Sequence, residues 1–374
     1  MYDHGATYRL LRPRLQEAVE RVMEGGQLDW GQEVPSFEQA FSRHLGVAHA
    51  VGTNSGTAAL KVALLSLGVG HGDEVVTVPN SDISTTSAIH HVGARAVWVD
   101  VEADTLNMDP TSLEAAITPR TKAIVPVHLY GHPADMASIM AVANQQGVPV
   151  VEDACLALGS SVAGFAVGTI GHIGCFSFAP SKHLGAFGSA GIAITNDGAL
   201  AERMKMFAGY GQQRCRHYSH EPVRLEHKVE GLNERLDELQ AAMLHVKLST
   251  LDDMLYLRRL HAARYHEALA ALPIDNPTER EGAKHSFRNY VIRLAKRDAL
   301  QEHLTAQGIA SGTPYVPPLH LQPAFRGYAS VLGTFPVTEE AADKLLAIPI
   351  APELSSAQID YVIAKIQRFF GVDS

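Results

Sequence analysis

Three short segments carry side chains that could act together in chemistry. The first, residues 53–58, opens a helical stretch and has hydroxyl side chains at Ser55 and Thr57 on either side of Gly56. The free amides of a helix start, the positive end of its dipole and a glycine that lets an anion approach the backbone suit a phosphate group. Ser and Thr are also favoured helix caps, so simple capping is the alternative for this segment.

The second segment, residues 150–154, is an apolar strand that ends in Glu152 and Asp153. Ligands of open α/β sheets bind at the carboxyl ends of the strands. A carboxylate fixed at that edge could hold a positively charged ring nitrogen. The alternative is a carboxylate that caps the next helix.

The third segment, residues 174–182, is a strand with Ser177 between two aromatic residues, followed by Pro180 and Lys182. Lysine is ordinarily a solvated surface residue with a pKa of about 10.4. A lysine that is desolvated or adjacent to a cation loses its proton readily and can form a Schiff base with a carbonyl. The alternative is a lysine at a loop whose amine simply reaches solvent.

Short β-rich runs alternate with helical segments around these positions. Apolar residues at helical spacing predict helices over 13–25, 58–67 and 136–143, and apolar runs predict strands at 49–51, 75–78, 96–101, 123–128, 149–153, 175–178 and 191–195. This alternation is typical of a mostly parallel sheet covered by helices on both faces. We therefore expect an α/β fold.

The helical pattern then continues from residue 236 to residue 272, which is too long for one ordinary helix. We expect a bend between Ser249 and Asp253, where the apolar face loses register. The bend would separate a large cofactor-binding domain, residues 1–249, from a smaller C-terminal α+β domain, residues 250–374.

Composition narrows the class of protein. The 374 residues include 31 basic and 40 acidic side chains, a net charge of −9, so the chain as a whole offers no footprint for nucleic acid or an anionic membrane. The three cysteines, which are odd in number and contain no C-x-x-C pair, suggest neither a disulfide framework nor a thiolate zinc site. With no signal-like or membrane-spanning run, a cytoplasmic protein is expected.

Taken together, the three segments match the needs of one cofactor. A phosphate cradle, an aspartate for a pyridine nitrogen and a Schiff-base lysine, in that order on one α/β sheet, are what pyridoxal 5'-phosphate requires. No metal site is expected. Nineteen histidines are present, but His90-His91 and Tyr265-His266-Glu267 form no H-E-x-x-H pair, which leaves a metal hydrolase a weak alternative.

The chain also resembles the sugar aminotransferases of the DegT/DnrJ/StrS family, fold-type I pyridoxal-phosphate enzymes, over nearly its whole length. The matching runs include N-S-G-T-A-A-L from Asn54, P-V-H-L-Y-G from Pro126, V-E-D-A from Val151, F-S-F with S-K ending at Lys182, and G-L-N-E-R-L from Gly231. P-L-H from Pro318 and F-P-V-T-E from Phe335 match the small domain of the family.

The resemblance implies a role for each matched position. Lys182 would carry the Schiff base, Asp153 would pair with the pyridinium nitrogen, and Ser55, Gly56, Thr57 and Ser177 would lie at the phosphate. In relatives, the Asn of the G-x-N segment reaches the phosphate of the neighbouring subunit. Asn233 therefore implies a homodimer with shared active sites.

Several positions depart from the pattern of the family. Asp82 falls in the cofactor site where most relatives have an aromatic residue stacked on the ring, a face that an acid cannot supply. Leu156 stands in place of a frequent Gln, Ser189-Ala190 replaces an acidic residue followed by Gly, and Glu234 replaces an aromatic residue. These changes affect the identity of the substrate more than the class of reaction.

Substrate contacts follow from position in the family only. Trp30, Gly31, Tyr315 and His320 are the candidates, with ordinary packing as the alternative. By the same resemblance, the basic segment from Arg214 to Lys228 is predicted to lie near the pocket of the partner. Binding of an anionic substrate there is one hypothesis, and a plain solvated loop is the alternative.

The reaction implied by the resemblance is a ping-pong transamination. An amino donor, L-glutamate by resemblance, would aminate the cofactor with Lys182 as the base, and the cofactor would then aminate a keto-sugar, most often nucleotide-linked. A cyclitol ketone is the second candidate acceptor. The family also contains dehydratases, in which His replaces the lysine, and Lys182 argues against that activity. A non-catalytic regulatory protein that binds the cofactor is a competing hypothesis, suggested by Asp82.

Overall fold

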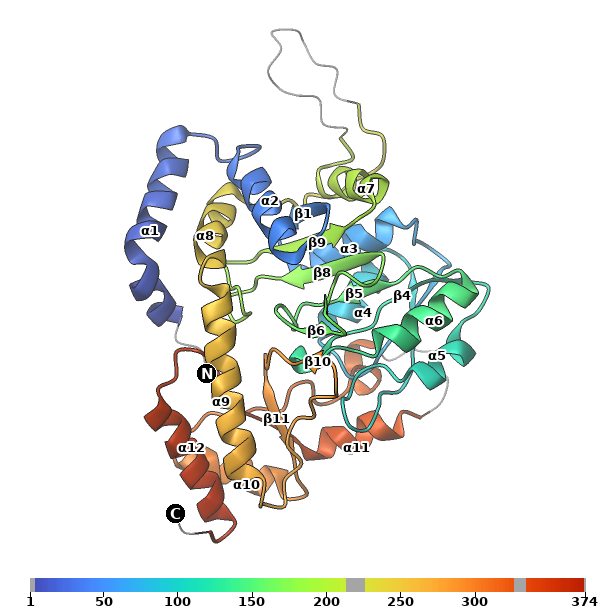
Figure 1. The fold of residues 1–374 in the computed structure, drawn as a ribbon. Helices are drawn as coiled ribbons and strands as arrows, with labels where there is room; N and C mark the ends of the chain where they lie inside the picture. Colours follow the sequence, from blue (N-terminus) through green and yellow to red (C-terminus); the bar gives the residue numbers. More distant parts are fainter. Residues whose placement is uncertain (1–3, 213–225, 326–333, 373–374) are drawn as a thin grey trace.

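A computed structural model describes residues 4–212, 226–325 and 334–372 of the chain (Figure 1). Its helices are α1 (His4–Gly25), α2 (Glu33–Leu45), α3 (Gly56–Ser66), α4 (Ile83–His91), α5 (Pro110–Ala116), α6 (Met136–Gln146), α7 (Gly198–Ala208), α8 (Glu238–Leu248), α9 (Leu251–Leu269), α10 (Arg297–Ala306), α11 (Pro336–Lys344) and α12 (Ser356–Phe369). Its strands are β1 (His49–Thr53), β2 (Glu74–Thr77), β3 (Arg95–Trp98), β4 (Thr121–Ile124), β5 (Val151–Asp153), β6 (Ser161–Val162), β7 (Phe165–Ala166), β8 (Ile173–Ser177), β9 (Gly191–Thr195), β10 (Ala283–Lys284), β11 (Tyr290–Arg293) and β12 (Leu345–Ile348).

Two groups of strands form the central sheet. One group has the order β3-β2-β4 and is parallel, and the other has the order β1-β9-β8-β5. Parallel bridges from Ile124 to Val150 and from Val127 to Asp153 join the groups at β4 and β5. Only β9, between β8 and β1, runs antiparallel to its neighbours in this sheet. The predicted α/β fold with a mostly parallel mixed sheet is therefore confirmed.

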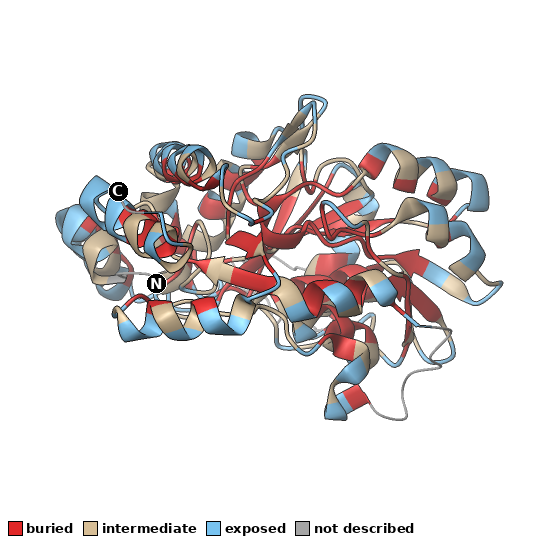
Figure 2. Ribbon diagram, turned by 90° about the horizontal axis from the view of Figure 1, so that it is seen from below, coloured by how far each residue is buried: buried red, intermediate tan, exposed pale blue. Residues whose placement is uncertain are grey.

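Helices cover both faces of the sheet. Successive residues of one strand accordingly lie in different apolar clusters, each of which contains residues of different helices. Val75 packs with residues of α3 and α4, whereas Val76 packs with residues of α6. Likewise, Cys175 faces the α3 side and Phe176 faces α2 and α8. In Figure 2 the buried strands accordingly form a central layer between helices that are exposed on their outer sides.

The C-terminal part has an apolar core of its own. Residues of α9, β11, α10, β12 and α12 pack into one cluster of residues numbered 262 to 366, and β11 pairs antiparallel with β12. The long helical stretch is interrupted, as predicted, between Leu248 and Leu251, and α9 runs from there into the C-terminal part (Figure 1). We propose the break as the boundary between domains 1–249 and 250–374, which this separate core supports.

Two N-terminal helices differ from the prediction. The first helix begins at His4, not near residue 13, and Pro13 lies inside it. Proline removes one backbone donor from a helix and bends it, but does not always end it. Helix α2 is absent from the predicted elements, although Phe37 and Phe41 are fully buried against Phe176 and Phe178.

No helix among the described ranges is both long enough and apolar enough to cross a membrane.

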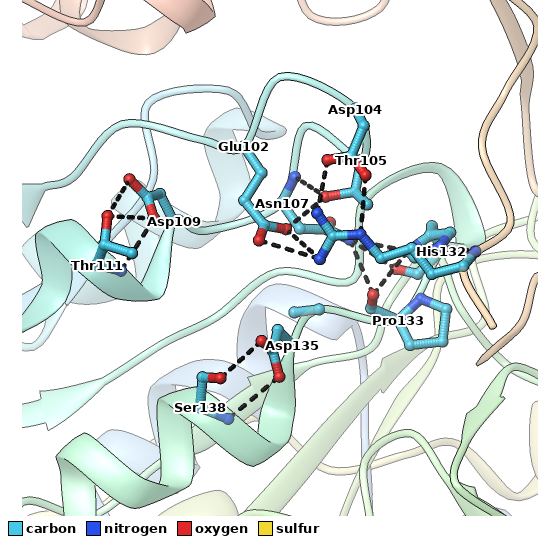
Figure 3. A network of polar contacts seen from close by, with 12 residues as sticks. Glu102, Asp104, Thr105, Asn107, Asp109, Thr111, His132, Pro133, Asp135 and Ser138 are labelled. Carbon is cyan, nitrogen blue, oxygen red and sulfur yellow. Dashed lines mark hydrogen bonds and ion pairs between the residues drawn. The ribbon is translucent and has the colours of Figure 1, made fainter. Parts of the chain in front are cut away.

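A junction segment, residues 285–289, connects the C-terminal part to the sheet. The amide of Ser286 donates to the Gly131 carbonyl at 3.0 Å and the amide of Asn289 donates to the Tyr130 carbonyl at 3.2 Å. Nearby, the Arg280 guanidinium pairs with Glu102 at 3.0 Å and Asp104 at 2.6 Å, and the Arg280 amide donates to His132 Nε2 at 3.4 Å. Figure 3 shows Glu102, Asp104 and His132 in one network of polar contacts. These contacts hold the C-terminal part against the loops that follow β3 and β4.

Buried imidazoles surround this junction. His183 Nε2 donates to the Ser286 carbonyl at 3.2 Å, and His285 Nδ1 accepts from the Phe287 amide at 2.9 Å. Burial, with neighbouring arginines, lowers the pKa of both imidazoles well below 6.5. Burial also lowers the pKa of His132. His183 and His285 therefore stay neutral at pH values where an ordinary imidazole takes up a proton, and His132 takes one up less readily than an ordinary imidazole.

These histidines predict that acid weakens the fold. Below pH 6.5 the unfolded chain binds protons that the folded protein does not, so the free energy of unfolding falls as pH falls, by up to about 1.4 kcal/mol per pH unit for each such group. Thermal unfolding between pH 7.5 and 5.5 measures this effect. In His285→Asn, the Asn Oδ1 can replace Nδ1 as acceptor. The unfolding temperature of this variant should fall less between pH 7.5 and 5.5 than that of the wild type. The exposed control His245→Asn should behave as the wild type, and an unchanged pH slope in His285→Asn would contradict the assignment.

Candidate active site

A cavity of about 340 Å3 lies where the three predicted segments meet. It is bounded by the start of α3, the start of α4 and the carboxyl ends of β5 and β8, with two residues from beyond α9. The predicted site residues that line it are Ser55, Gly56, Thr57, Asp82, Asp153, Ser177, Lys182 and Tyr315. Long-range folding thus brings together most of the positions expected to bind one cofactor.

The start of α3 forms one wall. Ser55 is its N-cap, and the Ser55 Oγ accepts from the Ala58 amide at 3.1 Å. A Cβ at Gly56 would lie 2.6 Å from the Ser177 Cβ and 2.8 Å from the Cys155 Sγ, so only glycine fits there. The backbone therefore approaches the cavity closely with unpaired first-turn amides and the positive end of the dipole, as a phosphate site requires.

The carboxylates at the end of β5 have different surroundings. Asp153 lines the cavity; its Oδ2 accepts from the Thr85 hydroxyl at 2.7 Å and its Oδ1 from the Cys155 amide at 3.2 Å. Both bonds fix the position of the carboxylate. In this position Asp153 can hold a protonated ring nitrogen.

Glu152 points away from the cavity and is fully buried. It accepts hydrogen bonds from the amides of Gly168, Ile170 and Gly171 and from His128 Nε2 at 2.5 to 2.9 Å. The Ala134 amide donates to His128 Nδ1, so the ring proton is on Nε2. Glu152 is thus a structural anchor for the turn before β8.

Lys182 follows β8 in a turn closed by its own amide, which donates to the Ala179 carbonyl at 2.8 Å. Burial lowers the pKa of its amine, and the Arg288 guanidinium acts in the same direction, against Cys155, Asp153 and Asp82. The amine is therefore easier to deprotonate than a surface lysine, which is the property a Schiff-base nucleophile needs.

Asp82 caps the next helix at the same edge. Its Oδ1 accepts from the Ser84 amide at 2.9 Å at the start of α4, while the side chain also lines the cavity. Tyr315 lies across the cavity, and its ring is parallel to that of Tyr130 with centroids 6.2 Å apart. Burial, reinforced by Asp82, raises the pKa of the Tyr315 hydroxyl, so that it stays a donor.

Ser181, Arg288 and Cys155 are among the cavity residues that the sequence did not indicate as site residues. Ser181 is adjacent to the predicted lysine, and Arg288 lies more than one hundred residues later and donates to the Ser181 Oγ at 3.1 Å. Cys155 also lines the cavity, and burial raises the pKa of its thiol, which keeps it uncharged. Proximity to a motif could have indicated Ser181 and Cys155, whereas Arg288 belongs to no motif.

Four predicted positions do not line the cavity. Trp30 is partly exposed beneath the Arg235 guanidinium, 4.4 Å from the ring centroid, and the Gly31 amide donates to Glu238 at 2.7 Å. His320 packs against Trp98 and Phe335 and contacts Glu339 at 3.1 Å.

The fourth, Asn233, is exposed, and its carbonyl accepts from the Asn54 side chain at 3.3 Å, next to the α3 cradle. The substrate role of Trp30, Gly31 and His320 and the cofactor role of Asn233 stay predictions. Most of the basic segment from Arg214 lies outside the described residues. Of its charged groups, Glu226 and Lys228 are described and form an ion pair.

The cavity residues fit pyridoxal phosphate. The glycine cradle at the helix start suits its phosphate, Asp153 suits its ring nitrogen and the low-pKa Lys182 suits its aldehyde. His183 is the residue after Lys182, but its imidazole contacts the junction segment and does not line the cavity. Among the residues that the structure describes, no three His, Cys, Asp or Glu side chains are grouped to hold a metal.

Comparison with known proteins agrees with this geometry. The model of the DegT/DnrJ/EryC1/StrS aminotransferase family matches residues 10–367. The chain is 40% identical over 374 residues to the pleiotropic regulatory protein of Geobacillus stearothermophilus, covering 99% of this chain and 98% of that protein. It is also 40% identical over 368 residues to the dTDP-3-amino-3,4,6-trideoxy-alpha-D-glucose transaminase of Streptomyces venezuelae, covering 98% and 95%.

A solved structure shares the fold throughout. DesV of S. venezuelae, crystallised in complex with a ketimine intermediate, matches with a TM-score of 0.93 and 39% identity, covering 98% of this chain and 97% of that chain. The family resemblance noted in the sequence is therefore confirmed over the full length.

The cradle predicts a specific effect of one methyl group. Gly56→Ala places a Cβ against Ser177 and Cys155, which should push the helix start away from the phosphate and weaken pyridoxal-phosphate binding by about tenfold or more. An absorbance titration of the apoprotein measures the dissociation constant. Gly70→Ala is the matched control, since a Cβ there meets nothing within 4 Å. Equal cofactor affinity in the two variants would show that the cradle is not the phosphate site.

Proposed function

Because the chain belongs to the DegT/DnrJ/EryC1/StrS aminotransferase family, we propose that it transfers an amino group from an amino acid to the ketone of a nucleotide-linked sugar, with pyridoxal phosphate as cofactor. The observation that carries this proposal is the single cavity that contains Lys182, Asp153 and the Gly56 cradle together. The sugar substrate rests on the S. venezuelae relative, a transaminase named for a dTDP-linked amino sugar.

The residues of this chain have distinct tasks in such a reaction. The bound cofactor supplies an electron sink that stabilises negative charge at the carbon next to the amine. Lys182 would hold the cofactor through its amine and, once free, would move the proton at the donor carbon. Its lowered pKa makes the amine a readier proton acceptor than the ammonium of a surface lysine.

Asp153 would hold the ring nitrogen of the cofactor. Its carboxylate is fixed by the Thr85 hydroxyl and the Cys155 amide, and a carboxylate in that position would favour a protonated ring nitrogen. The start of α3 would hold the phosphate of the cofactor. Cavity walls such as Leu156 and Val127 limit the access of water.

We propose that the active form is a homodimer. Asn233 is exposed, and its carbonyl contacts Asn54 beside the start of α3. Its side chain is therefore available to the phosphate site of a second copy of the chain. The family resemblance supports this sharing of sites.

L-Glutamate is the proposed donor, in a ping-pong sequence with a keto-sugar as acceptor; a cyclitol ketone is the alternative acceptor. The test is the visible absorption of the holoprotein before and after L-glutamate. We expect the band of the lysine-bound cofactor to give way to that of pyridoxamine phosphate. Lys182→Ala should show neither the band nor the change, while Lys122→Ala, on the exposed end of β4, should show both.

The acceptor is identified in a second step. The aminated holoprotein is mixed separately with dTDP-linked and UDP-linked keto-sugars and with a cyclitol ketone, and return of the original band is followed. Return with the cyclitol alone would replace the sugar proposal by its alternative. A wild-type band that no amino acid converts would contradict the aminotransferase function.

A further inference from the structure

A second cavity, of about 260 Å3, adjoins the turn that contains Lys182. Its walls come from this turn, the end of α8, the first half of α9, Thr7 of α1 and the loop that follows β12. Of the described residues that line this rear cavity, Lys182 alone also lines the active-site cavity. The two cavities are therefore separate spaces that meet at one side chain.

Apolar side chains make up a large part of the rear cavity. They are Leu184, Phe187, Leu251, Met254 and Pro352. An apolar cavity of about 150 Å3 is known to bind benzene, so the larger rear cavity accommodates an aliphatic side chain of several carbons. Small-molecule sites typically combine such walls with a few placed polar groups.

Glu353 supplies one of these polar groups. Its Oε1 accepts from the Thr7 hydroxyl at 3.1 Å, whereas its Oε2 is buried and accepts no hydrogen bond from the described residues. A buried carboxylate oxygen without a donor is costly, because desolvation is not offset. A ligand that donates a hydrogen bond to Glu353 would remove this cost.

Lys247 supplies the opposite charge. Its amine donates to the Gly185 carbonyl and lies 5.0 Å from the centroid of the Phe187 ring. An ammonium group has three donors, so this lysine can still donate to a ligand. Glu353 influences the pKa of Lys247, but no ion pair joins these two described residues. Burial lowers the pKa of the amine to about 8, so most of it carries its charge at pH 7.

Other charged or imidazole side chains of the lining bind backbone carbonyls. The Arg258 guanidinium donates to the carbonyls of Phe287 and Ile350, and the His183 imidazole donates to that of Ser286. With Lys182 assigned to the cofactor, the ammonium on α8 and the carboxylate after β12 are the pair that a ligand could join.

We propose that the rear cavity binds a free α-amino acid with an apolar side chain, its carboxylate on Lys247 and its ammonium on Glu353. The two charged groups of an amino acid are attached to one carbon, so one small molecule can satisfy a lysine and a glutamate that are close but unpaired. Both contacts would be charge-assisted hydrogen bonds. This site does not rest on the proposed aminotransferase function.

Other small ligands match the rear cavity less well. A simple carboxylate would pair with Lys247 but leave the Glu353 Oε2 without a donor and bring a second negative charge near it. An aliphatic amine would leave Lys247 without an anion. A dicarboxylic amino acid such as L-glutamate would place an additional charge among apolar walls, where desolvation is costly.

The test is isothermal titration calorimetry at pH 7 with L-leucine. The holoprotein is first treated with borohydride, so that the cofactor stays bonded to Lys182 and cannot react with the amino acid. We expect saturable binding of leucine. Two matched probes, 4-methylpentanoate without the ammonium and 3-methylbutylamine without the carboxylate, should each bind about 10- to 100-fold more weakly, the loss typical of one charge-assisted hydrogen bond.

Two variants assign the contacts. Lys247→Met should weaken leucine binding by a similar factor without weakening that of 3-methylbutylamine. Glu353→Gln, which keeps the shape of the side chain, should weaken leucine binding without weakening that of 4-methylpentanoate. A merely structural role would not produce these opposite selectivities. The matched controls are Lys284→Met and Glu114→Gln, both at exposed positions.

Three results would overturn the proposal. They are no binding of leucine to the wild type, binding of 4-methylpentanoate as tight as that of leucine, and leucine binding that both variants leave unchanged. The second result would indicate a site for anions alone, and the third a site elsewhere on the protein. Because the reduced holoprotein cannot turn over, none of these results bears on the aminotransferase function.

Discussion

Burial of the Lys182 amine is the electrostatic constraint on which the site depends. An ammonium group that is partly removed from solvent needs nearby negative charge, and a nucleophilic amine needs its proton to leave easily. The cavity meets both needs, because Asp153 and Asp82 favour the charged form of Lys182 whereas burial and Arg288 oppose it. These opposing influences retain the lysine side chain in the cavity and leave its amine reactive.

The same constraint explains why the elements around the cavity are anchored by buried hydrogen bonds. Glu152 accepts hydrogen bonds from three backbone amides of the turn before β8 and from His128. Strand β8 then leads to the turn that contains Lys182. A carboxylate whose two oxygens accept this many hydrogen bonds is rigid, since each alternative position would leave a buried polar group unpaired. Asp153, the next residue on β5, is directed to the opposite side and stays available to a ligand.

The C-terminal part contributes through the junction segment, residues 285–289. This segment contacts the turn at 130–131, the lysine turn and α9 at once, and it supplies Arg288 to the cavity. A shift of the C-terminal part would therefore move both the buried imidazoles and the arginine. Packing of the two parts and the chemistry of the site are coupled by the same five residues.

The sequence by itself determined the α/β class, the break between α8 and α9 and the local chemistry of the three segments. Each depends on short-range rules: apolar periodicity, glycine at a helix start, and a lysine after a strand. Only the tertiary structure decided which carboxylate of Glu152 and Asp153 faces the cavity, that α2 exists, and that Arg288 lines the same cavity as Lys182. The physical reason is that these features depend on the direction of side chains and on contacts between residues more than one hundred positions apart, which no local pattern encodes.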